Sequence, residues 1–315
     1  MNLSRRQFFT ALARPQSAPR RGPLPDMPEI TPTARFFRQY THATPRLNAE
    51  YWSFSVGGQV RRPLSLSYQD VLSLPSVELP CTLVCVSNRP GGERIGHAVW
   101  RGVPMTTLLD QIETPAEAAY ARLEAAGGGR TVVPLAALRN GLLATAMNGQ
   151  PLRPEHGFPA RLIIPGLYDH QQPRWIERVE LWETPGPGGL WERRGWTANS
   201  IATTSGLSVA RGLTVESGPV ALSGYAFAGP RKITAIEVSV DGGPWVSVDM
   251  GESRPNVWTR WKASWPAPGP GDYSLRVRAT DESGFVQPET ASAPFPNGTS
   301  AIHAITVRAT GGRFS

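Results

Sequence analysis

Two patterns of hydrophobic and polar residues divide the chain of 315 residues near residue 206. In the first part, short apolar stretches alternate with turns rich in glycine and proline. Alternation over 51–67 around a Gly-Gly pair predicts two short strands and a turn, and the β-branched run 81–87 predicts a buried strand. Short strands mixed with short helices are typical of an α+β domain.

Two short helices are predicted among these strands. A serine caps the apolar helix expected at 67–74, which ends before Pro75, and the segment 104–112 has the same character. The segments 130–138 and 142–149 are predicted as two strands, or as a strand and a helix. The segments 160–166 and 175–183 are predicted as strands, the first fully buried and the second alternating.

Beyond residue 206 the pattern is that of strands alone. The alternating segments, separated by turns, lie at 220–229, 233–250, 272–284 and 301–310. The step Asp241-Gly242-Gly243 predicts a tight hairpin turn. Several alternating strands within about 110 residues predict an immunoglobulin-like sandwich over 206–315.

The positive charge lies disproportionately at the amino terminus. Six arginines against Asp26 and Glu29 give residues 1–35 a net charge of +4, which leaves +3 of the formal +7 for the rest of the chain. No basic run interleaved with aromatic residues follows, so no nucleic-acid partner is expected. No apolar stretch approaches the ~20 residues that a membrane span requires, so a soluble protein is expected.

The first residues, Ser4 to Phe8, resemble the start of a twin-arginine export signal. The apolar run that follows stops at Arg14-Pro15 and is short for a working signal core of ~7–15 residues. Two interpretations stay open: a degenerate signal, or a tail over 1–35 that is disordered or draped over the surface. The weak apolar core favours a cytoplasmic over a periplasmic location.

Cys81 and Cys85 are the only cysteines. As residues of one strand they would lie too far apart for a disulfide, and their spacing does not support a closed zinc site. Three interpretations of Cys85 remain: a small buried hydrophobe, a nucleophile that needs a histidine such as His97 or His156, and a soft thiolate ligand of a redox metal.

The residues that follow Cys85 resemble the sulfite-oxidase family of molybdopterin enzymes. The resemblance starts at about Phe36 and is carried by "CVSNRPGGERIGHAVWRG", "HGFPAR", "RWIERVEL" and "WERRGW", and then by "VSVDGGPW" and "RATDESGFVQP". It implies a molybdopterin-binding catalytic domain over 36–200 and an immunoglobulin-like dimerisation domain over 206–315. The implied cofactor is Mo-molybdopterin.

The resemblance also implies roles for individual residues. Cys85 matches the thiolate ligand of molybdenum. The positions that match cofactor contacts are Arg38, His42, His156, Arg161, Gln172, Pro173 and Arg174. Taken alone, His156 would be a turn histidine and Arg161 a surface ion pair, whereas Trp100 would suit either the site entrance or the core.

The substrate side departs from the family pattern. Arg89 keeps one arginine of a pair, Pro90 replaces the other, and Trp196 stands where sulfite-oxidising members have a tyrosine. Gln171 and Gly127 replace a family arginine and a family aspartate. The candidate catalytic residues are therefore Cys85, Arg89 and Trp196, and the candidate replacement cations are Arg89, Arg101, Arg193 and Arg194.

The activity implied is oxygen-atom transfer to or from a small anionic or oxo substrate such as sulfite. Since the sequence shows no haem or flavin segment, electrons are expected to pass to an external acceptor such as a c-type cytochrome. A homodimer is expected. The alternatives are a sulfoxide or oxide reductase and a cofactor-binding subunit without catalysis.

Overall fold

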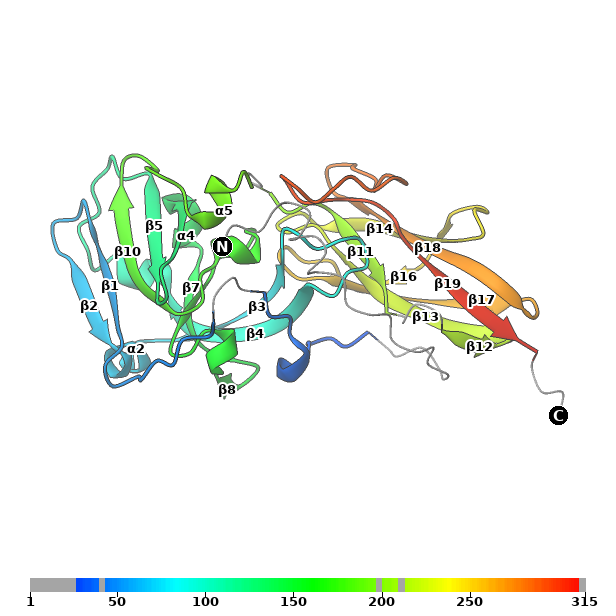
Figure 1. Cartoon of the computed structure of the whole chain (residues 1–315), viewed down its shortest axis with the longest axis horizontal. Helices are drawn as coiled ribbons and strands as arrows, with labels where there is room; N and C mark the ends of the chain where they lie inside the picture. The colour runs from blue at the N-terminus through cyan, green and yellow to red at the C-terminus, as the bar shows by residue number, and fades with distance from the viewer. Residues whose placement is uncertain (1–26, 40–42, 197–199, 209–212, 312–315) are drawn as a thin grey trace.

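The computed structural model describes residues 27–39, 43–196, 200–208 and 213–311. Two domains lie end to end along the long axis of the molecule, a mixed domain followed by an all-β domain (Figure 1). The twin-arginine-like motif at 4–8 and His42 lie outside the described residues.

The first domain contains two sheets. One consists of β1 (Ser53–Gly58), β2 (Leu64–Ser67), β5 (Tyr120–Ala125), β6 (Gly129–Pro134) and β10 (Ile176–Trp182), in the order β2-β1-β10-β5-β6 with β1 parallel to β10. The other consists of β3 (Val77–Val84), β4 (Ile95–Pro104), β7 (Leu142–Met147) and β8 (Gln150–Pro151), with β9 (Arg161–Ile163) paired to β7.

Short helices connect these strands, namely α2 (Tyr68–Ser73), α3 (Met105–Leu109), α4 (Leu135–Arg139) and α5 (Leu190–Arg193), together with the 3₁₀ turns η1 (Thr33–Arg35), η2 (Pro154–His156) and η3 (Asp169–Gln171). The predicted helix at 67–74 is confirmed. Ser67 and Asp70 form a reciprocal capping box at its start, which satisfies two backbone N–H groups. The predicted α+β class is confirmed as well.

The second domain is a sandwich of two sheets. One has the order β11 (Thr204–Leu207), β13 (Gly218–Phe227), β17 (Thr259–Ala267) and β16 (Asp249–Met250). The other has the order β12 (Thr214–Glu216), β19 (His303–Thr310), β18 (Gly271–Asp281), β14 (Ile233–Val240) and β15 (Val246–Ser247).

The turn between β14 and β15 is the hairpin that the sequence predicts. Asp241 and Gly242 both have positive φ, 49° and 74°, and the N–H of Gly243 donates to the carbonyl of Val240, so a tight turn forms there within the longer connection 241–245. Strand β17 was not predicted, because the tryptophans and prolines of its segment obscure the alternation of its buried positions.

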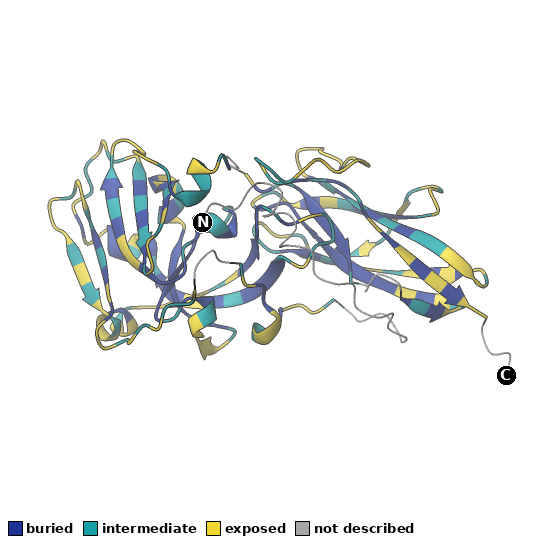
Figure 2. Cartoon of the chain, in the orientation of Figure 1, coloured by how far each residue is buried: buried dark blue, intermediate teal, exposed yellow. Residues whose placement is uncertain are grey.

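Buried residues follow the strands of both domains (Figure 2). One apolar cluster joins the domains and consists of Val84, Val86, Ile95, Tyr168, Trp196, Ile201, Tyr225, Phe227 and Trp258. Because both domains contribute to it, the end of β3 is fixed against the sandwich.

Residues 27–35, expected to be disordered or draped over the surface, lie across both domains. The N–H of Thr31 donates to the carbonyl of His97 on β4, and the indole N–H of Trp258 donates to the carbonyl of Glu29. In the described parts of the chain, no helix has the length and apolar character of a membrane span.

Asp281 ties the sandwich to the segment that precedes it. Burial raises the pKa of Asp281, but hydrogen bonds from Ser283, Thr203 and Arg231 outweigh burial and hold the pKa at about 2. A carboxyl whose folded-state pKa is depressed stabilises the protein above its unfolded pKa, and this stabilisation is lost as the pH falls through the folded pKa.

We therefore expect the urea midpoint to fall between about pH 4 and pH 2, and to fall less steeply in Asp281→Asn. The variant is also expected to be less stable at pH 6, since the amide accepts fewer charge-assisted hydrogen bonds. Urea titrations of both proteins at four pH values measure this. An equal slope in both proteins would contradict the assignment to Asp281.

Candidate functional site

Cys85 lies one residue beyond the end of β3, in a turn that its own backbone organises. Its N–H donates to the carbonyl of Arg94, and its carbonyl accepts from Asn88. The side-chain oxygen of Asn88 accepts from the N–H of Arg94, which closes the turn. The predicted strand 81–87 therefore ends three residues too late and starts four residues too late, because β3 spans Val77–Val84 and the turn begins at Cys85 itself.

The thiol of Cys85 is buried, with 5% of the residue exposed. Its sulfur lies 3.2 Å from the hydroxyl of Ser87, which also accepts from Arg94. Burial raises the pKa of the Cys85 thiol, and the hydrogen bond with Ser87 opposes this. A metal ligand must be deprotonated, so metal binding here would release a proton.

The other end of this turn rests on the sandwich. The N–H of Gly91 donates to the carbonyl of Ser205, and the carbonyl of Gly92 accepts from the hydroxyl of Tyr225. A Cβ on Gly91 would lie 2.2 Å from the ring of His303, and Gly91 has φ 62°. Both the close approach and the positive φ require glycine here.

Cys85 opens onto a cavity, called the Cys85 cavity below. Its lining consists of Gln39, Ala43, Cys85, Val86, 125–131, 169–170, 172–175, Leu190 and Trp191. The walls of the cavity are thus formed by the Cys85 turn, the β5–β6 hairpin, the loop from η3 to β10 and the start of α5. Of the predicted cofactor contacts, the structure brings Gln172, Pro173 and Arg174 to the same cavity as Cys85.

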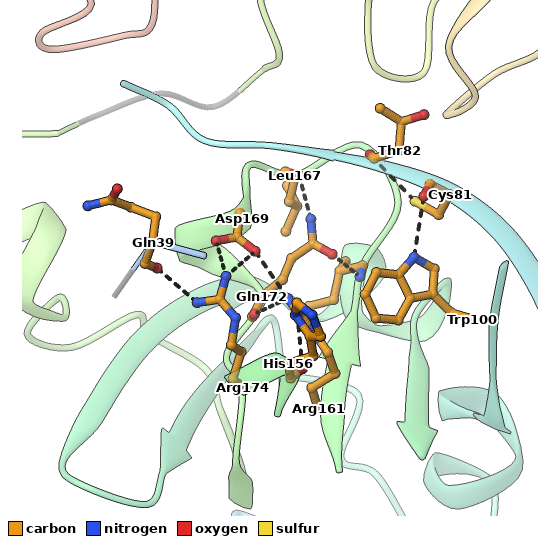
Figure 3. A network of polar contacts seen from close by, with 11 residues as sticks. Gln39, Cys81, Thr82, Trp100, His156, Arg161, Leu167, Asp169, Gln172 and Arg174 are labelled. Atoms are coloured by element: carbon orange, nitrogen blue, oxygen red, sulfur yellow. Dashed lines mark hydrogen bonds and ion pairs between the residues drawn. The ribbon is translucent and has the colours of Figure 1, made fainter. Parts of the chain in front are cut away.

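A buried ion-pair network lies in the wall of this cavity (Figure 3). The carboxylate of Asp169 accepts from Arg161 at 3.1 Å and from Arg174 at 3.0 Å. Arg174 also donates to the carbonyl of Gln39. Two guanidinium groups therefore share one carboxylate, so the three side chains together carry a net positive charge.

Arg161 is fully buried and does not line the cavity in the described part of the chain. Its guanidinium lies over the ring of Trp100 at 5.0 Å, and burial, foremost, lowers its pKa to about 10. It reaches the cavity through Asp169 and through the carbonyl of Gln172, both of which line it. Trp100 is also fully buried and donates to the carbonyl of Cys81, so it belongs to the core and not to the entrance.

The loop that carries Pro173 and Arg174 is held by Gln172. The side chain of Gln172 accepts from the N–H of Ile164 at 2.7 Å and donates to the carbonyl of Leu167. The carbonyl of Pro173 accepts from the N–H of Leu162 on β9. These bonds fix the position of Arg174 on the cavity wall.

His156 lies behind this wall, 2% exposed, on the turn η2. Its Nε2 pairs with the carbonyl of Thr33, whereas its buried Nδ1 has no hydrogen-bond partner among the described residues. Burial, as the largest effect, lowers its pKa. His156 therefore connects the loop after η2 to the N-terminal segment.

Several predicted residues lie away from the cavity. Trp196 is 7% exposed and packs edge-on against Trp191 and Phe295. Arg38 is exposed, and His42 falls among the residues that are not described. The candidate cations Arg89, Arg101, Arg193 and Arg194 are all exposed, and none belongs to the described cavity lining.

Sequence reasoning missed three features of the cavity. Asp169 and His170 gave no motif, and Trp191 was passed over in favour of Trp196 within the same segment. His170 packs against Trp191 at a ring distance of 6.1 Å, and its buried Nδ1 has no hydrogen-bond partner in the part of the chain that the structure describes. The Gly-Gly-Gly run at 127–129 was the available signal for a hairpin that approaches a ligand.

The residues present fit a molybdopterin group. The thiol of Cys85 is the soft donor that a redox metal of this kind prefers, and Arg174 offers a planar fork to a phosphate. Added Cβ atoms on Gly127 and Gly128 would meet nothing within 4 Å, so the hairpin backbone borders open space. The buried Nδ1 atom of His170 still has a hydrogen bond to make.

Two family models match the chain. The "Oxidoreductase molybdopterin binding domain" matches residues 41–191, and the "Mo-co oxidoreductase dimerisation domain" matches residues 196–295. Both lie where the resemblance of the sequence motifs places a cofactor domain and a dimerisation domain. These models imply Mo-molybdopterin as the cofactor.

Relatives of known name agree with these models. The chain is 30% identical to mitochondrial sulfite oxidase of Homo sapiens over 84% of its own length and 58% of that protein, and 30% identical to inducible nitrate reductase [NADH] 2 of Glycine max over 82% and 37%. It thus spans well under two thirds of either relative. The sulfane dehydrogenase SoxCD of Paracoccus pantotrophus shares the fold, with a TM-score of 0.80, 24% identity and coverage of 90% of this chain and 82% of that chain. The chain belongs to the sulfite-oxidase family of molybdopterin oxidoreductases.

Proposed function

We propose that the chain is an oxidoreductase that transfers an oxygen atom to or from a small oxo substrate such as sulfite. One observation carries this proposal: the thiol of Cys85 shares its cavity with Arg174 and with the glycine hairpin, inside the segment that the molybdopterin model matches. A soft donor and a phosphate-binding cation on one cavity are what this cofactor needs from a protein.

The residues of the chain have separate tasks in this proposal. Cys85 anchors the metal, and Arg174 neutralises the phosphate, with Asp169 and Gln39 fixing the guanidinium. The bound group supplies two-electron oxygen-atom chemistry. Trp191 and Leu190 exclude water from the cavity, and His170 offers a neutral imidazole to the substrate, since burial lowers its pKa.

The charges on the cavity wall favour a second candidate substrate. Arg174 is paired with Asp169, and the other lining arginine, Arg130, is paired with Glu124 at 2.9 Å. A sulfite dianion requires several converging cations. An uncharged oxide such as a sulfoxide, reduced in the reverse direction, suits this wall as well.

The partners follow from the same proposal. Two-electron chemistry needs an acceptor for electrons, and a c-type cytochrome is the class that we propose. The dimerisation model over 196–295 supports a homodimer. Light scattering after size exclusion measures the mass of the assembly, and a monomer at micromolar concentration would contradict the homodimer.

The test combines composition with kinetics. The chain is produced in a host that makes the cofactor, and its molybdenum and pterin are measured before any assay. We expect about one of each per chain, and turnover with sulfite and cytochrome c, or with dimethyl sulfoxide and a reduced viologen. A folded protein without molybdenum would contradict the proposal. Molybdenum without turnover of any oxo substrate would favour a cofactor-binding subunit.

A further inference from the structure

A second cavity of about 400 Å³ lies at the junction of the two domains. Its walls come from residues 27–29, from β4, from β16 and β17 and from the stretch between these two strands. We call it the junction cavity. It shares no lining residue with the Cys85 cavity, so the two cavities are separate sites.

His97 of β4 lies at the buried end of the junction cavity, with 4% of the residue exposed. Its Nδ1 lies 2.9 Å from the hydroxyl of Thr82, and that hydroxyl accepts the N–H of Trp258 at 2.9 Å. Thr82 is 2% exposed and its hydroxyl meets no other acceptor among the described residues, so donation of its proton to Nδ1 is the arrangement that satisfies it. This assigns the ring proton to Nε2, which is then a hydrogen-bond donor.

Nε2 of His97 makes no hydrogen bond to a described residue, although His97 lines the cavity. Buried polar groups in native structures are hydrogen-bonded to protein atoms or to bound molecules. The buried end of this cavity thus offers an N–H group and needs an acceptor.

Positive charge reinforces this preference. The described lining contains three cations, Arg254, Arg260 and Lys262, and three carboxylates, Glu29, Asp249 and Glu252. At His97 the cations prevail, because Arg254 and Arg260 are the groups that, after burial, lower its pKa to about 4. The imidazole is therefore neutral at pH 7, within a positive field. The potential at the buried end favours an anion.

The carboxylates of the cavity lie on its exposed side. Glu252 pairs with Arg254 at 3.7 Å and Glu29 with Arg260 at 3.3 Å, and both carboxylate side chains are more than 70% exposed. Exposed pairs of this kind contribute about 0–1 kcal/mol each. A ligand whose oxygen atoms approach from the buried side can therefore replace these carboxylates as the partners of Arg254 and Arg260.

The cavity wall also has an apolar part. Trp258 lines it and is itself stacked on Tyr225 at 5.7 Å, which fixes the plane of the indole. Met250 and Val257 lie on the same wall. A ligand with a planar or apolar carbon skeleton buries surface here that an inorganic ion would leave exposed.

We propose that the junction cavity binds a small organic carboxylate. Its oxygen atoms accept from Nε2 of His97 and from Arg254 and Arg260, and its carbon skeleton packs on Trp258. Since the binding residues come from both domains, the ligand also stabilises the domain junction by mass action.

Titration calorimetry on the full chain tests this with benzoate as the organic carboxylate and sulfate as the inorganic anion. We expect benzoate to bind more tightly than sulfate and to raise the melting temperature. Arg254→Gln and Arg260→Gln, both partly exposed and expected to fold, should each weaken benzoate binding about tenfold, as the loss of a charge-assisted contact does. Arg308→Gln removes an exposed arginine that pairs with Asp272 outside the cavity and should change nothing.

His97→Gln provides a second measurement, because glutamine keeps a donor, whereas His97→Phe removes it. Benzoate binding should be retained in part by the first variant and lost in the second. The proposal is overturned if neither anion binds at millimolar concentration, if sulfate binds as well as benzoate, or if both arginine variants bind benzoate like the parent. Because Cys85→Ser leaves this cavity intact, benzoate should bind that variant equally, whatever becomes of the proposed oxidoreductase activity.

Discussion

Cys85→Ser is expected to lower turnover by more than about a hundredfold while the pterin stays bound. Removing residues that merely orient a metal ligand already costs about 10- to 100-fold, and this change removes the soft donor itself. The phosphate contact proposed for Arg174 and the hairpin at 127–129 remain in place. Pterin fluorescence after oxidation, molybdenum analysis and steady-state rates measure the three effects separately.

Cys81→Ser is the matched control. Cys81 is also buried, but it lies within β3, and the described cavity lining does not include it. Burial raises its pKa to about 12, so its thiol stays protonated. This variant should keep its turnover per bound molybdenum. Full activity of Cys85→Ser would contradict both the metal ligand and the proposed function.

Asp169→Asn is expected to destabilise the first domain by about 3–5 kcal/mol, because it leaves the buried guanidinium of Arg161 without its carboxylate. Urea unfolding of the cofactor-free protein measures the change. The matched control is Asp110→Asn, since Asp110 pairs with Arg139 at a similar 3.3 Å but on the surface. That variant should lose less than about 1 kcal/mol.

A double variant separates the ion pair from a packing defect. Arg161→Met in the Asp169→Asn background removes the fully buried one of the two charges that lose their carboxylate. It should recover part of the lost stability, because an uncompensated buried charge is the costly part of a broken pair. If the double variant is less stable than Asp169→Asn, the loss comes from packing and not from the buried charge.

The sequence indicates the elements of this fold where local rules decide them. The capping box at Ser67, the turn at Asp241-Gly242 and the alternating sandwich strands follow from neighbouring residues alone. The position of Cys85 at the cavity followed only from a family resemblance. Burial and alternation do not distinguish a metal ligand from a small core residue.

The remaining misplacements have one physical cause. Asp169 accepts from both Arg161 and Arg174, yet only Arg174 belongs to the described lining of the cavity, and no local sequence pattern distinguishes the two arginines. Likewise Trp191 and Trp196 lie five positions apart in one segment, and only tertiary packing decides which of them reaches the Cys85 cavity. Such choices are made by contacts between distant segments.

The turn that carries Cys85 is braced from outside its own domain, through Gly91, Ser205 and the ring of His303. The first domain is consequently not a portable catalytic module. Without the sandwich, the first domain would keep its sheets but lose these contacts, which hold the turn that positions the sulfur of Cys85. In evolutionary terms, the two halves have to be inherited and tuned together.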